Sequence, residues 1–177
     1  LIITEINYHS ADDFNPGDWV EFYNPHDYSL DIGNWIFKDN NDIHSYRFPS
    51  NTFIEPASYF ILCRDTVAFS YLFPDVEDYF GNMQFGFSGA GELLRLFNDE
   101  EMLVDTVHYD DNAPWPTTPD GEGPTLELIS AQLDNALAES WEASEGHGSP
   151  GTYSTEVKRL GKMPEEIRIT VYPNPFS

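Results

Sequence analysis

Trp19-Val-Glu-Phe-Tyr-Asn-Pro25 and Tyr59-Phe-Ile-Leu-Cys63 are the two stretches that decide the fold class. Both are short and rich in aromatic and β-branched side chains, and the first ends on a turn dipeptide. Comparable segments recur on either side of them with no regular helix between. We expect strands at 1–8, 19–24, 30–38, 45–49, 52–64, 91–98, 102–110 and 125–130.

Turn-forming residues separate these segments, as in Asn15-Pro-Gly-Asp18, Asn40-Asn-Asp42 and Asp120-Gly121. Residues 65–73 are the main helical candidate, with Asp65 as N-cap and Pro74 after the end, and 132–139 suit one further helical turn. The sequence therefore predicts an all-β antiparallel sandwich of about eight strands with one short helix.

Acidic residues far outnumber basic residues, with 31 Asp and Glu against eight Lys and Arg. Residues 1–154 hold 28 of the acids and four of the bases, a net charge of −24 (4 − 28), and the rest carry +1 (4 − 3). Such a surface repels nucleic acids and anionic membranes, and no apolar run is long enough to insert into a bilayer. Cationic proteins, cations and neutral ligands stay open as partners, and solubility alone also explains the excess acid.

The chain has a single cysteine, Cys63, within an apolar run. An intrachain disulfide is therefore excluded, and the position is typical of a buried structural cysteine. The chain begins inside an expected strand, so we also expect it to be a piece of a longer protein.

Five motifs in order resemble the lamin tail domain. They are Trp19-Val-Glu-Phe-Tyr-Asn24-Pro, Asp31-Ile-Gly-Asn-Trp35, Tyr46-Arg-Phe-Pro49 with Thr52-Phe-Ile-Glu-Pro56, Gly91-Glu-Leu-Leu-Arg-Leu-Phe97, and Val104-Asp-Thr-Val-His-Tyr109. The opening Ile3-Thr-Glu-Ile6 and the later Trp115-Pro and Leu126-Glu-Leu are similar to bacterial, extracellular members. The resemblance covers about residues 1–154 and implies an immunoglobulin-like sandwich that serves as a non-catalytic interaction module. Filament formation is not implied, because heptad repeats are absent.

Ile169-Thr-Val-Tyr-Pro-Asn-Pro-Phe-Ser177 resembles the start of the C-terminal sorting domain of type IX secretion, cut short. We therefore divide the chain into a lamin-tail-like domain (1–154), a linker (155–166) and a truncated sorting domain (167–177). This resemblance implies a secreted or outer-surface location. A plain Pro-Asn-Pro turn after a strand is the alternative.

Glu5 and Glu21 interrupt apolar strands, where an unpaired buried carboxylate is costly. If their strands pair, the two carboxylates are placed to share a cation or to contact Arg95 or Arg47. Alternatively, both face solvent.

Oxygen-rich turns are the candidates for calcium, which prefers six to eight oxygen ligands. The favoured set is Asp110, Asp111 and Asn112 with Asp120; the turns around Asp12–Asp18 and Asp39–Asp42 are alternatives. None of them matches an EF-hand loop, and turn carboxylates are commonly just solvated. The sequence establishes no cofactor, and calcium is the one candidate.

Trp115, Tyr109 and Trp141 lie in or near expected loops and are the candidates for stacking on a sugar ring, although core or edge packing is the favoured explanation for most of these aromatic residues. The five histidines show no metal-binding spacing, and no nucleophile motif is present. We therefore expect no catalytic residues. The predicted function is an extracellular accessory or adhesion module, monomeric in isolation, that binds protein, matrix or polysaccharide; a carbohydrate-binding module and a hydrolase are the alternatives.

Overall fold

A computed structural model describes residues 1–152 of the 177-residue chain. The predicted boundary at 154, the linker and the sorting-domain start lie outside these residues. The elements are β1 (Ile2–Asn7), β2 (Trp19–Tyr23), β3 (Leu30–Asp31), β4 (Ile36–Lys38), β5 (Ser45–Arg47), β6 (Phe53–Ile54), β7 (Tyr59–Cys63), α1 (Thr66–Leu72), β8 (Tyr79–Phe80), β9 (Glu92–Phe97), β10 (Leu103–Tyr109), β11 (Leu126–Leu128), the 3₁₀ turn η1 (Ala138–Ser140) and β12 (Trp141–Ala143).

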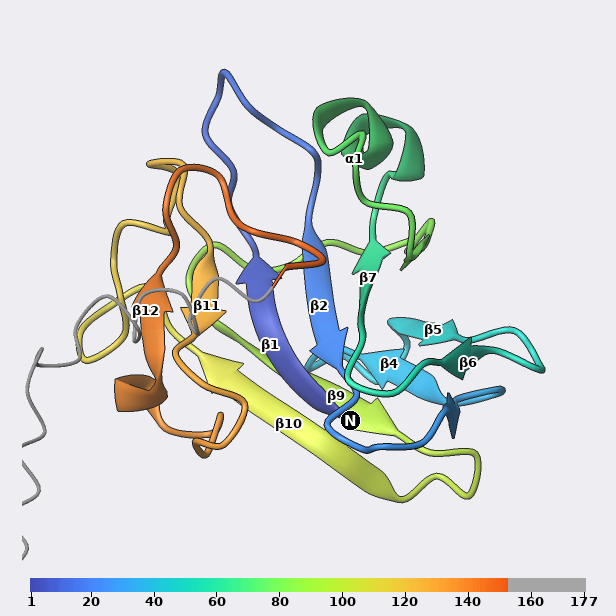
Figure 1. Cartoon of the computed structure of the whole chain (residues 1–177). Helices are drawn as coiled ribbons and strands as arrows, with labels where there is room; N and C mark the ends of the chain where they lie inside the picture. The colour runs from blue at the N-terminus through green and yellow to red at the C-terminus, as the bar shows by residue number, and fades with distance from the viewer. Residues whose placement is uncertain (153–177) are drawn as a thin grey trace, which may run out of the picture.

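Two sheets form the body of the domain (Figure 1). One has six strands in the order β12-β11-β1-β2-β7-β8, and the other has four in the order β10-β9-β4-β5. A two-strand ribbon, β3-β6, lies apart from both. The pairings are antiparallel except that of β7 with β8, which is parallel. The predicted all-β sandwich with one short α-helix is confirmed.

Two of the expected strands are each divided between sheets. The segment 30–38 breaks at Asn34, whose φ of 67° turns the chain, so β3 pairs with β6 while β4 pairs with β9. The segment 52–64 breaks at Ala57, whose φ is 50°, and this break separates β6 from β7. Left-handed backbone at a non-glycine residue carries little sequence signal, so these breaks were not expected.

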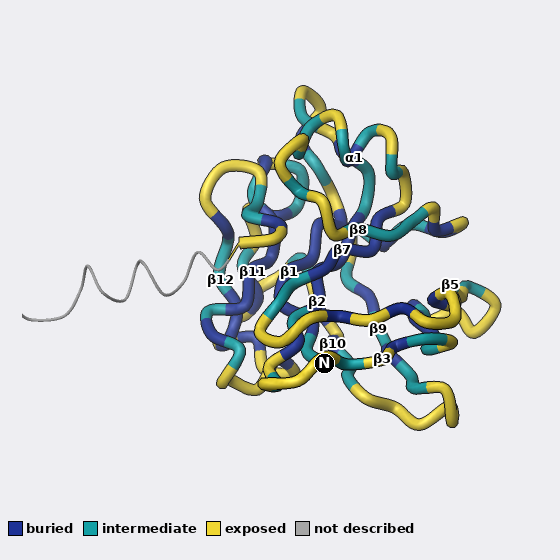
Figure 2. The backbone as a smooth tube through the Cα atoms, turned by 45° about the vertical axis from the view of Figure 1, so that its right-hand side comes forward, coloured by how far each residue is buried: buried dark blue, intermediate teal, exposed yellow. Residues whose placement is uncertain are grey.

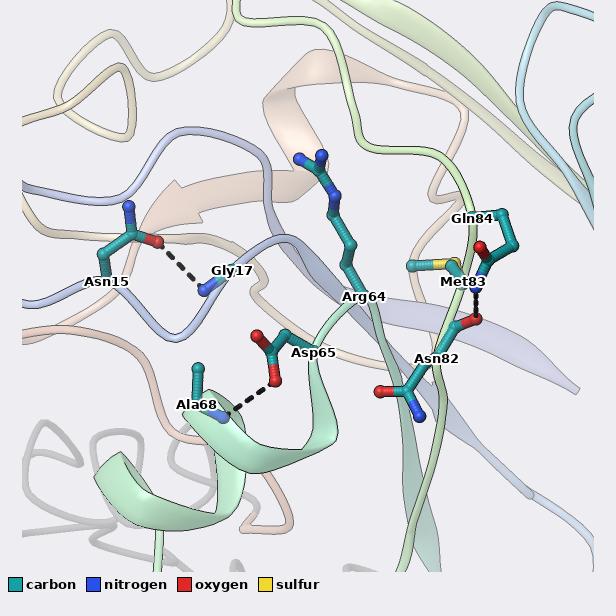
Figure 3. Close-up of a pocket in the computed structure, with 8 residues that line it drawn as sticks. All are labelled: Asn15, Gly17, Arg64, Asp65, Ala68, Asn82, Met83 and Gln84. Atoms are coloured by element: carbon teal, nitrogen blue, oxygen red, sulfur yellow. Dashed lines mark hydrogen bonds between the residues drawn. The ribbon is translucent and has the colours of Figure 1, made fainter.

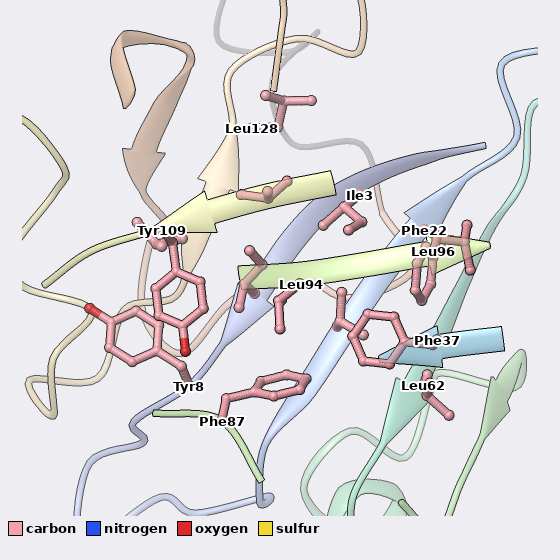
Figure 4. Packing of buried hydrophobic residues seen from close by; sticks show 14 of the residues in the cluster. Ile3, Tyr8, Phe22, Phe37, Leu62, Phe87, Leu94, Leu96, Tyr109 and Leu128 are labelled. Atoms are coloured by element: carbon pink, nitrogen blue, oxygen red, sulfur yellow. The ribbon is translucent and has the colours of Figure 1, made fainter. Parts of the chain in front are cut away.

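The main core fills the space between the two sheets, and its side chains alternate along the strands as a sandwich requires. Phe22 from the six-stranded sheet meets Phe37 from the four-stranded sheet edge to face, with ring centroids 5.6 Å apart. Figure 4 shows this contact together with the leucines and isoleucines around it. Figure 2 shows that the buried stretches run through the strands and that exposure is concentrated in the loops.

A smaller cluster packs on the outer face of the six-stranded sheet, beneath α1. It holds Trp19, Ile61, Cys63 and Phe69, all fully buried. The Asp65 side chain accepts from the amides of Val67 and Ala68, which confirms it as the helix N-cap. Burial raises the pKa of the Cys63 thiol to about 12, in keeping with a structural role. Among the described residues, no helix has the length and apolar character needed to cross a bilayer.

Candidate binding groove and the carboxylates beneath it

The three aromatic residues predicted to stack on sugars are buried, which corrects the expectation that they lie exposed near loops. The Tyr109 side chain is fully buried, stacks on Tyr8 at 4.7 Å and donates its hydroxyl to the Ser88 carbonyl (Figure 4). Trp115 and Trp141 lie with ring centroids 6.0 Å apart in the same core. Their faces are covered by protein, so core packing accounts for them.

The residues predicted to bind calcium make contacts of their own. The Asn112 side-chain amide donates to both Asp110 and Asp111, and its backbone amide donates to Asp110. The backbone hydrogen bond from Asn112, followed by the side-chain one, lowers the pKa of Asp110. Asp120 instead lies 2.5 Å from the His9 ring nitrogen. Within residues 1–152, no three acidic, histidine or cysteine side chains converge as metal ligands would. Calcium binding stays a prediction.

Four glutamates form a continuous row across the outer face of the six-stranded sheet. Glu5 lies opposite Glu21 on β2 and opposite Glu127 on β11, and Glu127 lies opposite Glu142 on β12. Opposed residues on neighbouring strands have Cβ atoms about 5 Å apart, and like charges there repel. The strands of Glu5 and Glu21 therefore pair as considered above, but the two carboxylates are 1% and 2% exposed rather than facing solvent.

Glu5 and Glu21 are buried because the segment 144–152, here called the strap, crosses above them (Figure 1, orange-red). The strap donates the Ser149 amide to Glu5 at 3.0 Å and the Gly151 amide to Glu21 at 2.7 Å. Threonine hydroxyls supply the next donors, from Thr125 to Glu5 at 2.5 Å and from Thr4 to Glu21 at 2.7 Å. The Ser149 hydroxyl also donates to Glu5 at 3.5 Å, so one backbone amide and two hydroxyls hold Glu5, while one amide and one hydroxyl hold Glu21.

No arginine within residues 1–152 neutralises Glu5 or Glu21, in contrast to one sequence-based alternative. Arg95 donates to the Asp39 carbonyl and pairs with Asp42 at 3.0 Å, while Arg47 donates to the Asn34 carbonyl. Removal from water is therefore the largest influence on the pKa values of Glu5 and Glu21. Burial raises the pKa of Glu5 to about 8, and burial followed by the repulsion of Glu5 raises the pKa of Glu21 well above its ordinary value.

The end of the strap forms one wall of a groove at the β7–β8 edge of the sheet. The first hollow, of about 550 Å³, lies between residues 150–152, residues 57–61 of β7 and its approach, and the loop 75–78. A second hollow of about 270 Å³ continues toward residues 53–55 and β8. The two share Ser58, Tyr59, Glu77 and Asp78, so we treat them as one surface, the acidic groove.

Carboxylates and aromatic rings line the acidic groove. Its acids are Glu55, Asp75, Glu77 and Asp78, all exposed, and its rings are Phe53, Tyr59, Phe60, Tyr79 and Phe80. None of the residues that line it is a lysine or an arginine. The wall formed by the strap is fixed through the Gly151–Glu21 hydrogen bond, which couples the groove to the buried carboxylates.

Another hollow, of about 560 Å³, lies beside the start of α1 between Arg64 and residues 82–84 (Figure 3). Three polar side chains that line this hollow already accept hydrogen bonds from backbone amides. Asp65 caps the helix, Asn15 accepts from the Gly17 amide, and Asn82 accepts from the Thr66 amide. These contacts hold the loops around α1 together, so we assign this hollow a structural role.

The comparison with protein families agrees with this architecture. Residues 1–111, from β1 through β10 and just beyond, match the family described as Lamin Tail Domain. The chain belongs to the lamin tail domain family. A comparison with curated proteins found none that matches it.

This lamin tail domain continues its sandwich beyond the matched residues. β11 pairs with β1, β12 pairs with β11, and the strap then returns across β1 toward β2. Glu127, Glu142 and one wall of the acidic groove are supplied by this later part. Sequence reasoning noticed Glu5 and Glu21 but missed the groove, because its walls come from three segments separated by many residues. The acidic run Asp75-Val-Glu-Asp78 was the one local signal.

Proposed function

We propose that this lamin tail domain is a non-catalytic interaction module within a larger secreted or cell-surface protein, where it contacts a protein or matrix partner. The observation that carries the proposal is the acidic groove, an open surface with exposed carboxylates and aromatic walls on a rigid sheet edge. Membership of the lamin tail domain family supports the assignment, because these immunoglobulin-like domains serve as interaction modules.

The secreted or outer-surface location rests on sequence. The stretch 169–177 resembles the start of a type IX sorting domain and lies outside the described residues. The strongly acidic surface suits a soluble extracellular protein as well. Protease shaving of intact cells that carry the epitope-tagged parent protein tests the location: loss of the tag supports it, and protection in intact but not lysed cells contradicts it.

Binding without catalysis is tested on the whole chain. We expect no turnover in a screen of esterase, phosphatase, nuclease and glycosidase substrates, together with saturable binding to an immobilised extracellular protein or polysaccharide. Reproducible turnover that a single carboxylate substitution abolishes would identify a hydrolase. A glycan-array signal would identify a carbohydrate-binding module, although the three aromatic residues first considered for that role are in the core.

A further inference from the structure

The charge of the acidic groove is uncompensated within residues 1–152. Glu55, Asp75, Glu77 and Asp78 form no ion pair with a described basic residue. The four bases in this range are engaged elsewhere: Lys38 and Arg95 with Asp42, Arg64 with Asp18, and Arg47 with a backbone carbonyl. The groove therefore keeps a negative potential that a cationic partner would complement.

The aromatic walls restrict which cation fits. Phe53 is 57% exposed, while Tyr59 and Tyr79 are half-buried and present part of their rings to the groove. Tyr59 stacks on Tyr23 at 4.6 Å, which fixes its orientation. Lysine and arginine combine an apolar stem with a charge that is attracted to ring faces, so both parts of such a side chain match a groove that holds rings beside carboxylates. No metal-ligand cluster occurs in the described part of the chain.

The shape of the groove favours a peptide over a single side chain. Two adjoining hollows, of about 550 Å³ and about 270 Å³, share one lip at Glu77 and Asp78, so a segment that runs along the lip can place one side chain in each. An extended segment presents alternate side chains on the same side, which suits this arrangement. Nucleic acids and anionic lipids are repelled by the same carboxylates.

We propose that the acidic groove binds an extended peptide segment of a protein partner through at least two lysine or arginine side chains, one in each hollow. This inference rests on the proposed function and names the class of partner. The inference can be wrong while the proposed function is right, because an interaction module that used another surface would still bind its partner after the groove is altered.

The test uses the whole chain and a fluorescein-labelled peptide, Gly-Lys-Val-Arg-Val-Lys-Gly, with fluorescence anisotropy in 50 mM and 500 mM NaCl. The groove variant combines Glu55→Gln, Glu77→Gln and Asp78→Asn. The matched control combines Asp99→Asn, Glu100→Gln and Glu101→Gln, and it removes an equal number of negative charges from the β9–β10 turn. Phe53→Ser tests the aromatic wall, at a side chain exposed enough to leave the core unchanged.

We expect the groove variant to bind the peptide at least tenfold more weakly than the wild type, the control variant to bind within twofold, and Phe53→Ser to bind several-fold more weakly. Equal loss in both triple variants would reveal attraction to net charge alone and overturn the proposal, as would absence of binding in 50 mM salt. Binding that appears only after Lys158, Arg159 and Lys162 are changed to Gln would make the chain's own basic stretch the occupant and overturn the assignment to a partner.

Discussion

Replacing Glu5 by glutamine should abolish the pH dependence that this residue gives to folding. Glutamine keeps the shape and an oxygen that can accept from the Thr125 hydroxyl and the Ser149 amide, but it cannot ionise. The wild-type side chain is 1% exposed, and burial raises its pKa to about 8 from an ordinary 4.5. The substitution therefore removes the titration of Glu5, relieves the repulsion that raises the pKa of Glu21, and leaves the packing of the strap in place.

The sign follows from where the proton is held. Between pH 4.5 and 8 the folded state keeps a proton on Glu5 that the unfolded state has released, so the free energy of unfolding falls as the pH rises. The contribution is fully present below pH 4.5 and is lost by the time the pH passes 8. From pH 5 to pH 8 the loss through this one group amounts to about 3 to 4 kcal/mol at 1.36 kcal/mol per pKa unit.

Urea unfolding followed by tryptophan fluorescence at pH 5, 6.5 and 8 measures the effect. We expect Glu5→Gln to match the wild type within about 1 kcal/mol at pH 5, and to exceed it by about 3 to 4 kcal/mol at pH 8. Glu100→Gln, which removes an exposed carboxyl in the β9–β10 turn, is the control and should follow the wild-type curve. Parallel stability curves for wild type and Glu5→Gln across this range would refute the reasoning.

Three further changes test other parts of the structure. Gly148→Ala places a Cβ 2.7 Å from the Glu5 carboxylate at a φ of +100°. We therefore expect the free energy of unfolding in urea to fall by about 1 to 3 kcal/mol and hydrogen exchange to become faster at the Ser149 and Gly151 amides. Unchanged exchange at these two amides would contradict the assigned strap contacts. Asp65→Ala removes the α1 cap and should cost about 1 kcal/mol in the same assay, whereas Asp65→Asn should restore most of it. Calcium at millimolar concentration is expected to raise the melting temperature of the wild type but not of Asp111→Asn, and identical melting curves with calcium and with EDTA would reject calcium binding.

Local patterns predicted the framework of this fold, and long-range pairing determined the rest. The alternation in Trp19–Tyr23 and Tyr59–Cys63 identified two central strands, and Asp65 with Pro74 identified the helix. β8 and β12 were missed because no alternating apolar run or motif marks them, and each is defined by its pairing with a neighbouring strand, β7 or β11.

The candidate site was harder to predict for the same reason. Glu5 and Glu21 drew notice as acids within apolar strands, but their burial depends on the strap, which lies more than 120 residues away along the chain. Trp115 and Trp141 were considered for sugar binding because they lie near loops, but both side chains belong to the core, as the core-packing alternative held. The spacing of residues along the sequence does not indicate which loop covers which face of a sheet.

The glutamate row also determines what the domain exposes when it opens locally. Lifting of the strap would uncover ionisable groups on four adjacent strands instead of the apolar face that most sheets conceal. In neutral or alkaline surroundings these groups would take up water and charge, so two opened copies would repel each other. Lifting of the strap would therefore expose charged groups and not a surface prone to aggregation.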